Sequence, residues 1–338
     1  MDNWTQIVSL PRRIAGRSGV FRRGLRAGWF GAVAAVGVAT AASATPTSGT
    51  LMSGFNVITN GNFSSSADIE GPMLVGGNLS GSGTEMGLGT PLPSGLAGYG
   101  AINVVGNTAG ASYNANNLSV VVASPNQGAT FSGASSVTYN ASFPAPFNSI
   151  WQQLSQVSAS LSLLSSTPGS SLSNGSFNAG ATTVNGVANV AVLDITAAQL
   201  EAVGNPTMNL GSAQLLIINV DTNGTGGSYS PAGGTNFNGQ GYAGNVLWNF
   251  YDASSLGFPV EFGGSVLAPG AAVTNSSPID GTLVAASFNG TGELHYKPLG
   301  TTGQALLSSY GGATVPEPGS LVLLVSGLAG LRVLRRRR

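Results

Sequence analysis

The middle of the chain carries short apolar runs that are separated by glycine, asparagine or proline. Runs of this length between turn-forming residues are typical of short, buried β-strands. Disordered segments usually combine high net charge with few β-branched residues, and this region does not. The pattern therefore predicts a folded β domain with strands at Met73–Val75, Val120–Val122, Val190–Leu193, Leu215–Ile218 and Val246–Trp248.

One part of this pattern is repeated. Ile69–Val75 matches Ile279–Ala285 in residue class at each position, and Gly264–Ala268 repeats the core of the motif. The glycines that begin the last two copies, Gly264 and Gly281, are 17 residues apart. One short strand per turn at such a spacing, with glycine and asparagine at the corners, is typical of a parallel β-helix.

The alternative fold is an antiparallel β-sandwich. Asn-Gly pairs favour two-residue hairpin turns, which parallel strands do not use. Such pairs occur at Asn60-Gly61, Asn185-Gly186 and Asn238-Gly239. We take the β-helix as the main prediction and keep the sandwich as the alternative.

Two helices interrupt the β pattern. From Asn148 to Ser165 the apolar residues recur at helical spacing on one stripe, and Pro168-Gly169 is expected to end this long helix. A short helix is expected to begin at Thr196, because Gln199 follows at the capping-box position. Leu200 and Val203 would then point inward. Both helices are expected to pack against the β-helix or to cap its end.

The charge distribution excludes several classes of function. Of the 12 basic residues, Lys297 is the only one between Ala27 and Leu331, and the same stretch holds 11 of the 12 acidic residues. An acidic domain lacks the clustered Lys and Arg that displace phosphate counterions, so nucleic acid is not an expected partner. The chain has no cysteine, which excludes disulfides and cysteine-ligated metal sites.

Residues 1–44 have the three-part layout of a secretory signal peptide. An arginine-rich region runs to Arg26, and the uncharged stretch Ala27–Ala42 follows. This stretch is shorter than the roughly 20 residues that span a bilayer. The small residues Ala42 and Ala44 suit signal peptidase, so we predict cleavage after Ala44, by either the general or the twin-arginine export route.

The C-terminus carries a second signal. Val315-Pro316-Glu317-Pro318 precedes the short uncharged run Gly319–Leu331, and arginines end the chain. Those arginines favour the cytoplasmic side of a membrane. This order resembles a PEP-CTERM sorting signal. The resemblance implies a Gram-negative-type envelope, a transient inner-membrane contact through residues 319–334, and an exosortase that recognises the Pro-Glu-Pro motif and removes the tail.

Further motifs follow one another in a fixed order between Gly54 and Pro298. Their residues are Asp68, Glu70, Gly71, Gly76, Gly77, Asn78, Trp248, Asn249, Asp280, Gly281, Gly292, Glu293 and His295. Together these motifs resemble the choice-of-anchor A domain, a secreted bacterial module that occurs with alternative C-terminal anchors. The resemblance implies an adhesive, β-helix-like surface domain without an established catalytic centre.

The predicted organisation has five parts. They are a signal peptide at 1–44, a short linker at 45–53, the choice-of-anchor A-like β domain at 54–299, a Gly/Ser/Thr-rich linker at 300–314 and the sorting signal at 315–338. Only the β domain is expected to contain a functional surface of the mature protein.

Catalysis is the main alternative to adhesion. A lyase needs a basic residue and a Ser–His–Asp triad needs a histidine, and Lys297 and His295 are the only such residues in the domain. We expect both on a solvated strand near the exit of the domain. A polysaccharide hydrolase needs only two carboxylates, for which Asp68 with Glu70, or Asp280 with Glu293, are candidates. We predict that the protein is not an enzyme and keep the hydrolase as an alternative.

A metal site is the second alternative. The loop from Asp221 to Gly227 alternates oxygen donors, as Ca²⁺ prefers, but it lacks the distal glutamate of an EF-hand. A glycine-rich turn without an ion is the simpler interpretation. We predict no cofactor, with Asp221 and Asn223 as candidate Ca²⁺ ligands. The carboxylates of Asp68, Glu70 and Asp280 equally suit turns in which they accept backbone N–H groups.

These observations predict a non-enzymatic protein of the cell surface or extracellular matrix that adheres to or organises extracellular polysaccharide, as in a biofilm. Its expected partners are signal peptidase and exosortase during export, and then polysaccharide or other surface proteins. A Ca²⁺-dependent self-assembling surface protein is a further alternative. Ice binding would need regular ranks of threonine, and no Thr-x-Thr ladder is present. Candidate stacking residues are Tyr242, Tyr251 and Tyr296, whereas Trp151 and Trp248 are expected in the core.

Overall fold

The computed structural model describes residues 45–87, 92, 95–124, 128–231, 237 and 241–310. These residues belong to one compact unit. The predicted signal peptide with Ala42 and Ala44, and the sorting residues Val315, Pro316, Glu317 and Pro318, lie outside the described residues.

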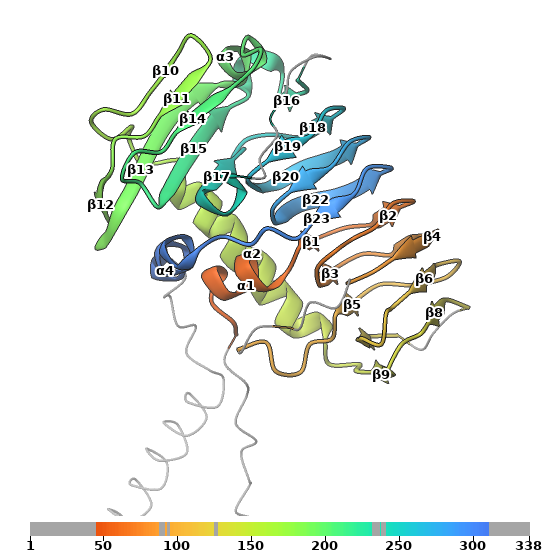
Figure 1. The fold of residues 1–338 in the computed structure, drawn as a ribbon. Helices are drawn as coiled ribbons and strands as arrows, with labels where there is room; N and C mark the ends of the chain where they lie inside the picture. Colours follow the sequence, from red (N-terminus) through yellow and green to blue (C-terminus); the bar gives the residue numbers. More distant parts are fainter. Residues whose placement is uncertain are drawn as a thin grey trace, which may run out of the picture. The chain divides into compact units, whose positions relative to one another are not determined.

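The described chain winds into a parallel β-helix with three faces (Figure 1). Successive turns pair through parallel strands on each face. This arrangement confirms the predicted β-helix and shows that the β-sandwich alternative was wrong. The 17-residue spacing is the length of one turn, since Val266 pairs with Leu283.

The first face is the longest ladder of the stack. In spatial order its strands are β13 (Val187–Thr196), β15 (Leu215–Asp221), β17 (Val246–Asn249), the first part of β20 (Ser265–Asn275), the first part of β22 (Leu283–Gly290), β1 (Val57–Thr59), β3 (Met73–Val75), β5 (Ile102–Val104), β7 (Ser119–Val122) and β9 (Ser136–Tyr139). All five strands predicted from apolar runs belong to this face.

The other two faces are shorter ladders. The second face contains β16 (Ser228–Tyr229), β18 (Ser255–Phe258), the second parts of β20 and β22, β2 (Phe63–Ser65), β4 (Leu79–Glu85), β6 (Ser112–Asn114) and β8 (Thr130–Ser132). The third face contains β19 (Phe262–Gly263), β21 (Ile279–Asp280) and β23 (Leu294–His295), and it continues through single bridges at Ile69.

The chain enters the stack in its middle rather than at an end. Strand β1 pairs with β3 on one side and with β22, the last long strand, on the other. The two copies of the predicted repeat therefore lie on either side of β1. Asn56 closes this junction, because its Nδ2 donates to Gly281 O, 225 residues away, at 2.8 Å. The β-helix thus consists of an N-terminal half (β1 to β9) and a C-terminal half (β13 to β23) that meet at β1 and β22.

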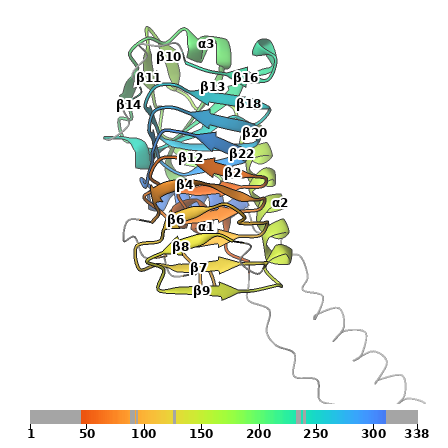
Figure 2. The same cartoon turned by 90° about the vertical axis from the view of Figure 1, so that its right-hand side faces the viewer.

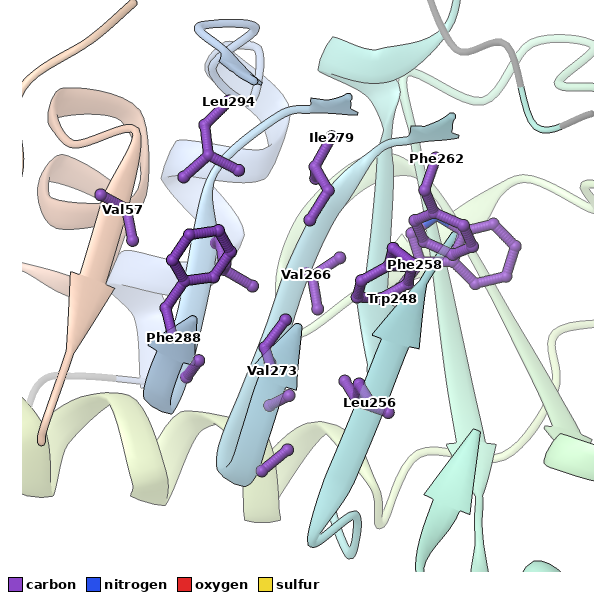
Figure 3. Close-up of a cluster of buried hydrophobic side chains, with 14 of the residues drawn as sticks. Val57, Trp248, Leu256, Phe258, Phe262, Val266, Val273, Ile279, Phe288 and Leu294 are labelled. Atoms are coloured by element: carbon purple, nitrogen blue, oxygen red, sulfur yellow. The ribbon is translucent and has the colours of Figure 1, made fainter. Parts of the chain in front are cut away.

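Helices cover the outer side of the first face. Helix α2 (Pro144–Leu161) runs along the stack, and its residues Ile150, Leu154 and Val157 pack on outward residues of the strands, such as Leu74 and Leu267 (Figure 1). The first-face strands are therefore buried on both sides, which explains their uninterrupted apolar runs. Inward residues of all three faces fill the centre of the β-helix (Figure 3).

Both predicted helices are present. Helix α2 begins four residues before the predicted Asn148, with prolines in its first turn, and ends at Leu161, before the predicted Ser165. Helix α3 (Ala197–Glu201) has the predicted capping box between Thr196 and Gln199. Leu200 and Val203 are buried as expected.

Two further helices were not predicted. Helix α1 (Ser48–Gly54) begins in the segment expected as a linker at 45–53 and ends one residue beyond it, and α4 (Thr301–Tyr310) lies in the segment expected as a linker at 300–314. Their small residues allow close packing, since a Cβ on Gly49 would lie 2.0 Å from Gln304 O. The Oγ1 atom of Thr47 lies 2.8 Å from Ser308 Oγ, so the two ends of the described domain meet. The described residues between 45 and 310 therefore include the β-helix, its core and both closing helices.

A small cap finishes the C-terminal half. It consists of the sheet β10 (Ser171–Ser173), β11 (Ser176–Asn178) and β14 (Thr207–Asn209), with α3 and strand β12 (Thr182–Val184) beside it. Asn185-Gly186 forms a hairpin turn, as predicted, between the antiparallel strands β12 and β13. Asn60-Gly61 lies between β1 and β2, which belong to different faces, and Asn238-Gly239 lies outside the described residues. The short 3₁₀ turns η1 (Asn223–Thr225) and η2 (Ala243–Asn245) complete the C-terminal half.

Candidate functional site

The strands of the second face stack one above another with no helix in front of them (Figure 2). Alternate residues along each strand point into the core or outward. The inward positions hold large apolar side chains, such as Leu256, Val273 and Phe288, all of which are buried. This alternation leaves the outward positions to small residues, most of which are polar.

Strand register aligns those outward residues into ladders. One ladder runs through Gly257, Thr274, Asn289, Ser64 and Ser80, and a second runs through Ser228, Ser255, Ala272 and Ser287. None of these side chains is charged. Neighbouring rungs of a β-sheet are about 4.8 Å apart, so the ladders place hydroxyl and amide groups at a regular spacing on a flat surface.

The third face brings together several of the predicted site residues around His295. Its Nδ1 lies 2.6 Å from Asp280 Oδ1, and its Nε2 lies 2.8 Å from Glu293 Oε2. Glu70 approaches from the N-terminal half, where its Oε2 accepts a hydrogen bond from Tyr296 N at 2.8 Å. Glu261, which precedes β19, reaches Asp280 from the next turn. We call these five residues, Glu70, Glu261, Asp280, Glu293 and His295, the histidine cluster.

The electrostatics of the histidine cluster favour bound protons. Burial opposes a charge on His295, but its hydrogen bonds to Glu293 and Asp280 and the nearby charge of Glu70 outweigh burial and raise its pKa. Burial, followed by the hydrogen bond and the negative charge of Asp280, raises the pKa of Glu261. Asp280 is fully buried, and while Glu261 is ionised the Oδ2 of Asp280 has no hydrogen-bond donor among the described atoms. A proton on Glu261 would supply a donor to this carboxylate.

This arrangement differs from the solvated strand that we expected for His295. The side chain of His295 is only 18% exposed and is held by carboxylates on both ring nitrogens. Both ring nitrogens are therefore occupied by carboxylates, and within the described residues neither of them has a hydrogen bond to a serine. Glu70 accepts a backbone N–H from Tyr296, which is distant in the sequence, so this contact is not the local turn expected for it, and Asp280 binds the side chain of His295.

The candidate Ca²⁺ ligands lie at the end of β15. Asp221 Oδ1 accepts a hydrogen bond from Asn223 N at 2.9 Å, and the backbone then turns through η1. Within the described residues, no group of three or more acidic or histidine side chains is arranged to hold a metal ion. The Ca²⁺ site at Asp221 and Asn223 stays a prediction.

A shallow groove of about 540 Å³ adjoins this loop. Tyr251 lines it together with Leu163, Asp194, Asp221 and Gln199. Partial burial and the charges of Asp221, Asp252 and Asp194 raise the pKa of Tyr251. Of the predicted stacking residues, Tyr251 is the one that the structure places in an open groove.

The other aromatic candidates are occupied within the fold. Tyr242 and Tyr296 donate their hydroxyl groups to the backbone carbonyls of Phe237 and Ser53. Trp248 is fully buried, as predicted, and Trp151 is half-buried against the helix-covered core.

Most of the remaining motif residues hold the turns of the β-helix. A Cβ added to Gly71, Gly76, Gly77, Gly281 or Gly292 would lie 2.6 Å or less from a neighbouring atom. Asn78 links three turns at one corner: its N–H donates to Asn62 Oδ1 and its Oδ1 accepts from Asn107 N, both at 2.9 Å. These residues are needed for the turns to stack, which is a structural role.

Asn249 belongs to a buried ladder that fastens α2. Its Nδ2 donates to Asn219 Oδ1 at 2.9 Å and to Ser158 O at 2.9 Å, and its Oδ1 accepts from Ser158 Oγ at 2.6 Å. Asn219 Nδ2 continues the ladder to Asp194 Oδ1 and Leu161 O. The ladder satisfies the last carbonyls of α2 and sets its position on the first face.

Sequence reasoning missed the outward ladders of the second face and Glu261. The ladder residues come from turns that are far apart in the chain, and only the register shows that they align. The 17-residue repeat contained the signal for Glu261, because it places Gly263 beside Asp280.

The profile of the ice-binding-like adhesive domain matches residues 48–296, and that of the PEP-CTERM protein-sorting motif matches residues 314–338. A comparison with curated proteins found no match. Within the described residues, no helix is long and apolar enough to cross a membrane.

Three solved structures are similar to the chain. An ice-binding protein from an Antarctic Flavobacteriaceae bacterium is 15% identical, with a TM-score of 0.34, over 76% of this chain and 49% of that protein, about half its length. An ice-binding protein from an Antarctic biological consortium is 12% identical, with a TM-score of 0.32, over 75% of this chain and 91% of its own. Ice-binding protein 1 of Shewanella frigidimarina is 14% identical, with a TM-score of 0.30, over 75% and 97%.

The two profile matches confirm the resemblances to a choice-of-anchor A-like adhesive domain and to a PEP-CTERM signal, which directs export to the cell surface and implies processing by an exosortase. The adhesive-domain profile runs from α1 to the end of β23 and covers more than half of the chain. The chain therefore belongs to the ice-binding-like adhesive domain family.

Proposed function

We propose that this protein is a non-enzymatic surface adhesin that binds or organises extracellular polysaccharide through its second face. The observation that carries the proposal is the pair of uncharged outward ladders on that face. Regularly spaced hydroxyl and amide groups offer both donors and acceptors to the hydroxyl groups of a glycan. A flat surface suits an extended polymer better than a single small ligand, which usually binds in a concave pocket.

The position of the chain ends supports this use of the second face. Thr47 and Ser308 meet beside α1 and α4, which pack on the first face. A protein held at the cell surface through either end would leave the ladders of the second face accessible. The groove at Tyr251 offers a further stacking surface for a sugar ring.

The test uses residues 45–314 incubated with purified exopolysaccharide of the producing organism. Co-sedimentation reports binding, and the chain length of the polymer is measured in the same tube, with Ca²⁺ or with a chelator. We expect binding with unchanged chain length. Shortened polymer would support the hydrolase alternative, and loss of binding with chelator would point to Asp221 and Asn223.

A matched pair of variants locates the binding surface. Thr274→Tyr places a bulky ring on the central ladder and is expected to reduce co-sedimentation strongly. Thr183→Tyr makes the same change at an exposed position of β12 and is expected to leave binding unchanged. Equal binding by both variants would contradict a role for the second face.

Adhesion to ice is a second candidate, favoured by the flatness of this face and by the description of the family. The central ladder holds one threonine among five residues, which departs from the regular threonine ranks expected for ice binding. Thermal hysteresis and ice recrystallisation measured on the same preparation distinguish the two. Activity in these assays without polysaccharide binding would replace our proposal.

A further inference from the structure

The stack of the β-helix stops abruptly at β8 and β9. Within the described residues, β9 pairs only with β7 and β8 pairs only with β6. Both strands lie at the end of the stack that is opposite to α3 and β10 (Figure 2). One hydrogen-bonding edge of each strand therefore has no neighbouring strand in the described part of the chain.

The hydrophobic core continues into this open end. Val137 pairs with Val120, and Tyr139 pairs with Val122, so both belong to the columns of residues that point inward. Val120 is 0% and Val122 is 2% exposed, whereas Val137 is 48% and Tyr139 is 55% exposed. The core columns thus end in two large apolar side chains that contact solvent.

Sheet edges and solenoid ends of soluble proteins are usually protected. Charged side chains, proline, bulges or a polar cap prevent unwanted strand pairing. Here no charged residue lies between Glu85 and Asp194, so the open end carries none of the charges that keep such edges apart. The opposite end, in contrast, has its own cap.

Charge also indicates which partner this end accepts. The domain is acidic, and most of its carboxylates lie near the junction or in the C-terminal half. Two copies of the chain would repel each other through those regions. If they met end to end at β8 and β9, only uncharged surfaces would be in contact and the acidic regions would lie far apart.

We propose that the open end is a self-association surface, at which β9 of one copy pairs with β9 of a second copy around a two-fold axis. The pairing would supply partners for the free strand edges and bury Val137 and Tyr139 of both copies. The two β-helices would then form one continuous stack, with a capped end on either side and two second faces for adhesion.

Sedimentation velocity over a range of concentrations tests the proposal on residues 45–314, which contain the complete described unit. We expect a reversible dimer that becomes stronger with added salt, because salt screens the repulsion between acidic domains. Val137→Lys combined with Tyr139→Lys should raise the dissociation constant at least about tenfold. Leu163→Lys is the control, since Leu163 is 85% exposed but lies beside Asp194 and Tyr251 of the C-terminal half, away from the open end.

Cross-linking identifies the contacting strand. Because the chain has no cysteine, Ser136→Cys, Val137→Cys and Thr138→Cys each introduce a single thiol. At least one of them should form a disulfide-linked dimer on mild oxidation, whereas Leu163→Cys should not. Circular dichroism and the melting temperature verify that each variant is folded.

Two results would overturn the proposal. One is a wild-type domain that stays monomeric at every concentration and salt level. The other is cross-linking at position 163 that equals cross-linking on β9. Val137→Lys and Val137→Glu give an additional test, because each charge should weaken the dimer of its own variant, whereas a mixture of the two proteins should form a dimer more strongly than either variant alone.

Discussion

At one end of the β-helix, the core is closed by a small sheet, a helix and an antiparallel strand, and at the other it ends in solvent. Trp248 lies near the closed end, where Phe177 of the cap packs edge-on against it with ring centroids 5.5 Å apart. Val137 occupies the last position of the same inward-facing column at the open end. The two residues are 0% and 48% exposed.

The two halves of the β-helix also differ in the side chains that fill their cores. Aromatic contacts fill the core of the C-terminal half, among them Tyr229 with Phe250, Phe237 with Trp248 and Phe258 with Phe262. The comparable columns of β5 and β7 hold isoleucine and valine. Parallel pairing joins the first-face strands in both halves, and the two halves differ in the side chains that they bury. We infer that the C-terminal half contributes most of the stability, whereas the N-terminal half provides an end that is available for contact.

The largest effect is expected when the side chains at the two ends of this inward-facing column, Trp248 and Val137, are truncated to alanine. Trp248→Ala should lower the free energy of unfolding by about 3–5 kcal/mol, because it removes a fully buried ring and the hydrogen bond from Nε1 to Gly263 O. Val137→Ala should cost less than about 1 kcal/mol in the monomer, since its side chain is half exposed. Denaturant unfolding monitored by circular dichroism measures both. Similar losses would show that the ends do not differ in stability.

The next prediction compares two buried asparagines, Asn249 and Asn103, which occupy the same first-face column in different halves. Asn249→Ala should cost about 2–3 kcal/mol, because the Oγ of Ser158 and the Oδ1 of Asn219 lose the Asn249 side chain as their hydrogen-bond partner. Asn103 instead bonds Gly100 N, Gly100 O and Met73 O, so Asn103→Ala should loosen only its own turn. Hydrogen exchange separates the two: faster exchange at the end of α2 is expected for the Asn249 variant alone. Faster exchange in α2 for both variants would contradict a specific link between the ladder and the helix.

Local sequence signals predicted some elements of this fold and did not predict others. Apolar runs predicted the first-face strands because these strands are buried on both sides, and the capping box predicted α3 because it is a local signal. Helices α1 and α4 were not predicted, because the small residues that allow their close contact resemble a flexible linker. The distinction between linker and helix is made by tertiary packing, which no local pattern records.

The candidate sites were harder to predict from the sequence, because they too depend on tertiary contacts. Asp280, Glu293 and His295 lie within one turn, and their proximity was foreseeable from spacing. The approach of Glu70 depends on the junction between β1 and β22, which joins residues more than 200 positions apart. The outward ladders of the second face likewise depend on a register that only the folded chain defines.

A smaller effect is expected at the capped end. Thr196→Ala removes the side chain that accepts from Gln199 N at 3.1 Å, and it should cost about 1 kcal/mol. Because α3 belongs to the cap, the loss should appear as faster hydrogen exchange around α3 and β15, with β7 and β9 unchanged. Ser142→Ala, an exposed position near the other end, serves as the control and should leave the unfolding free energy unchanged. Equal destabilisation by both variants would show that the cap does not act locally.

The smallest effect concerns the histidine cluster, which bridges the two halves at their junction. The folded pKa values of His295 and Glu261 are both raised, so folding is favoured by their protonated forms. Their contributions are complete below the unfolded pKa values, about 6.5 for histidine and about 4.3 for glutamate, and they decline as the pH rises through the folded values. Partial exposure of both groups screens their charges and keeps the effect modest.

Thermal unfolding between about pH 5 and about pH 8 measures this dependence. The melting temperature of the wild type should fall as the pH rises. His295→Gln should show a weaker decline, and Glu261→Gln combined with it should remove most of the remainder. Because Glu70 belongs to the N-terminal half and Glu261, Asp280 and Glu293 to the C-terminal half, added proton binding should protect the amides of β1 and β22 from exchange more than those of β9. A melting temperature that rises with pH, or equal protection at the open end, would show that the cluster does not couple the halves.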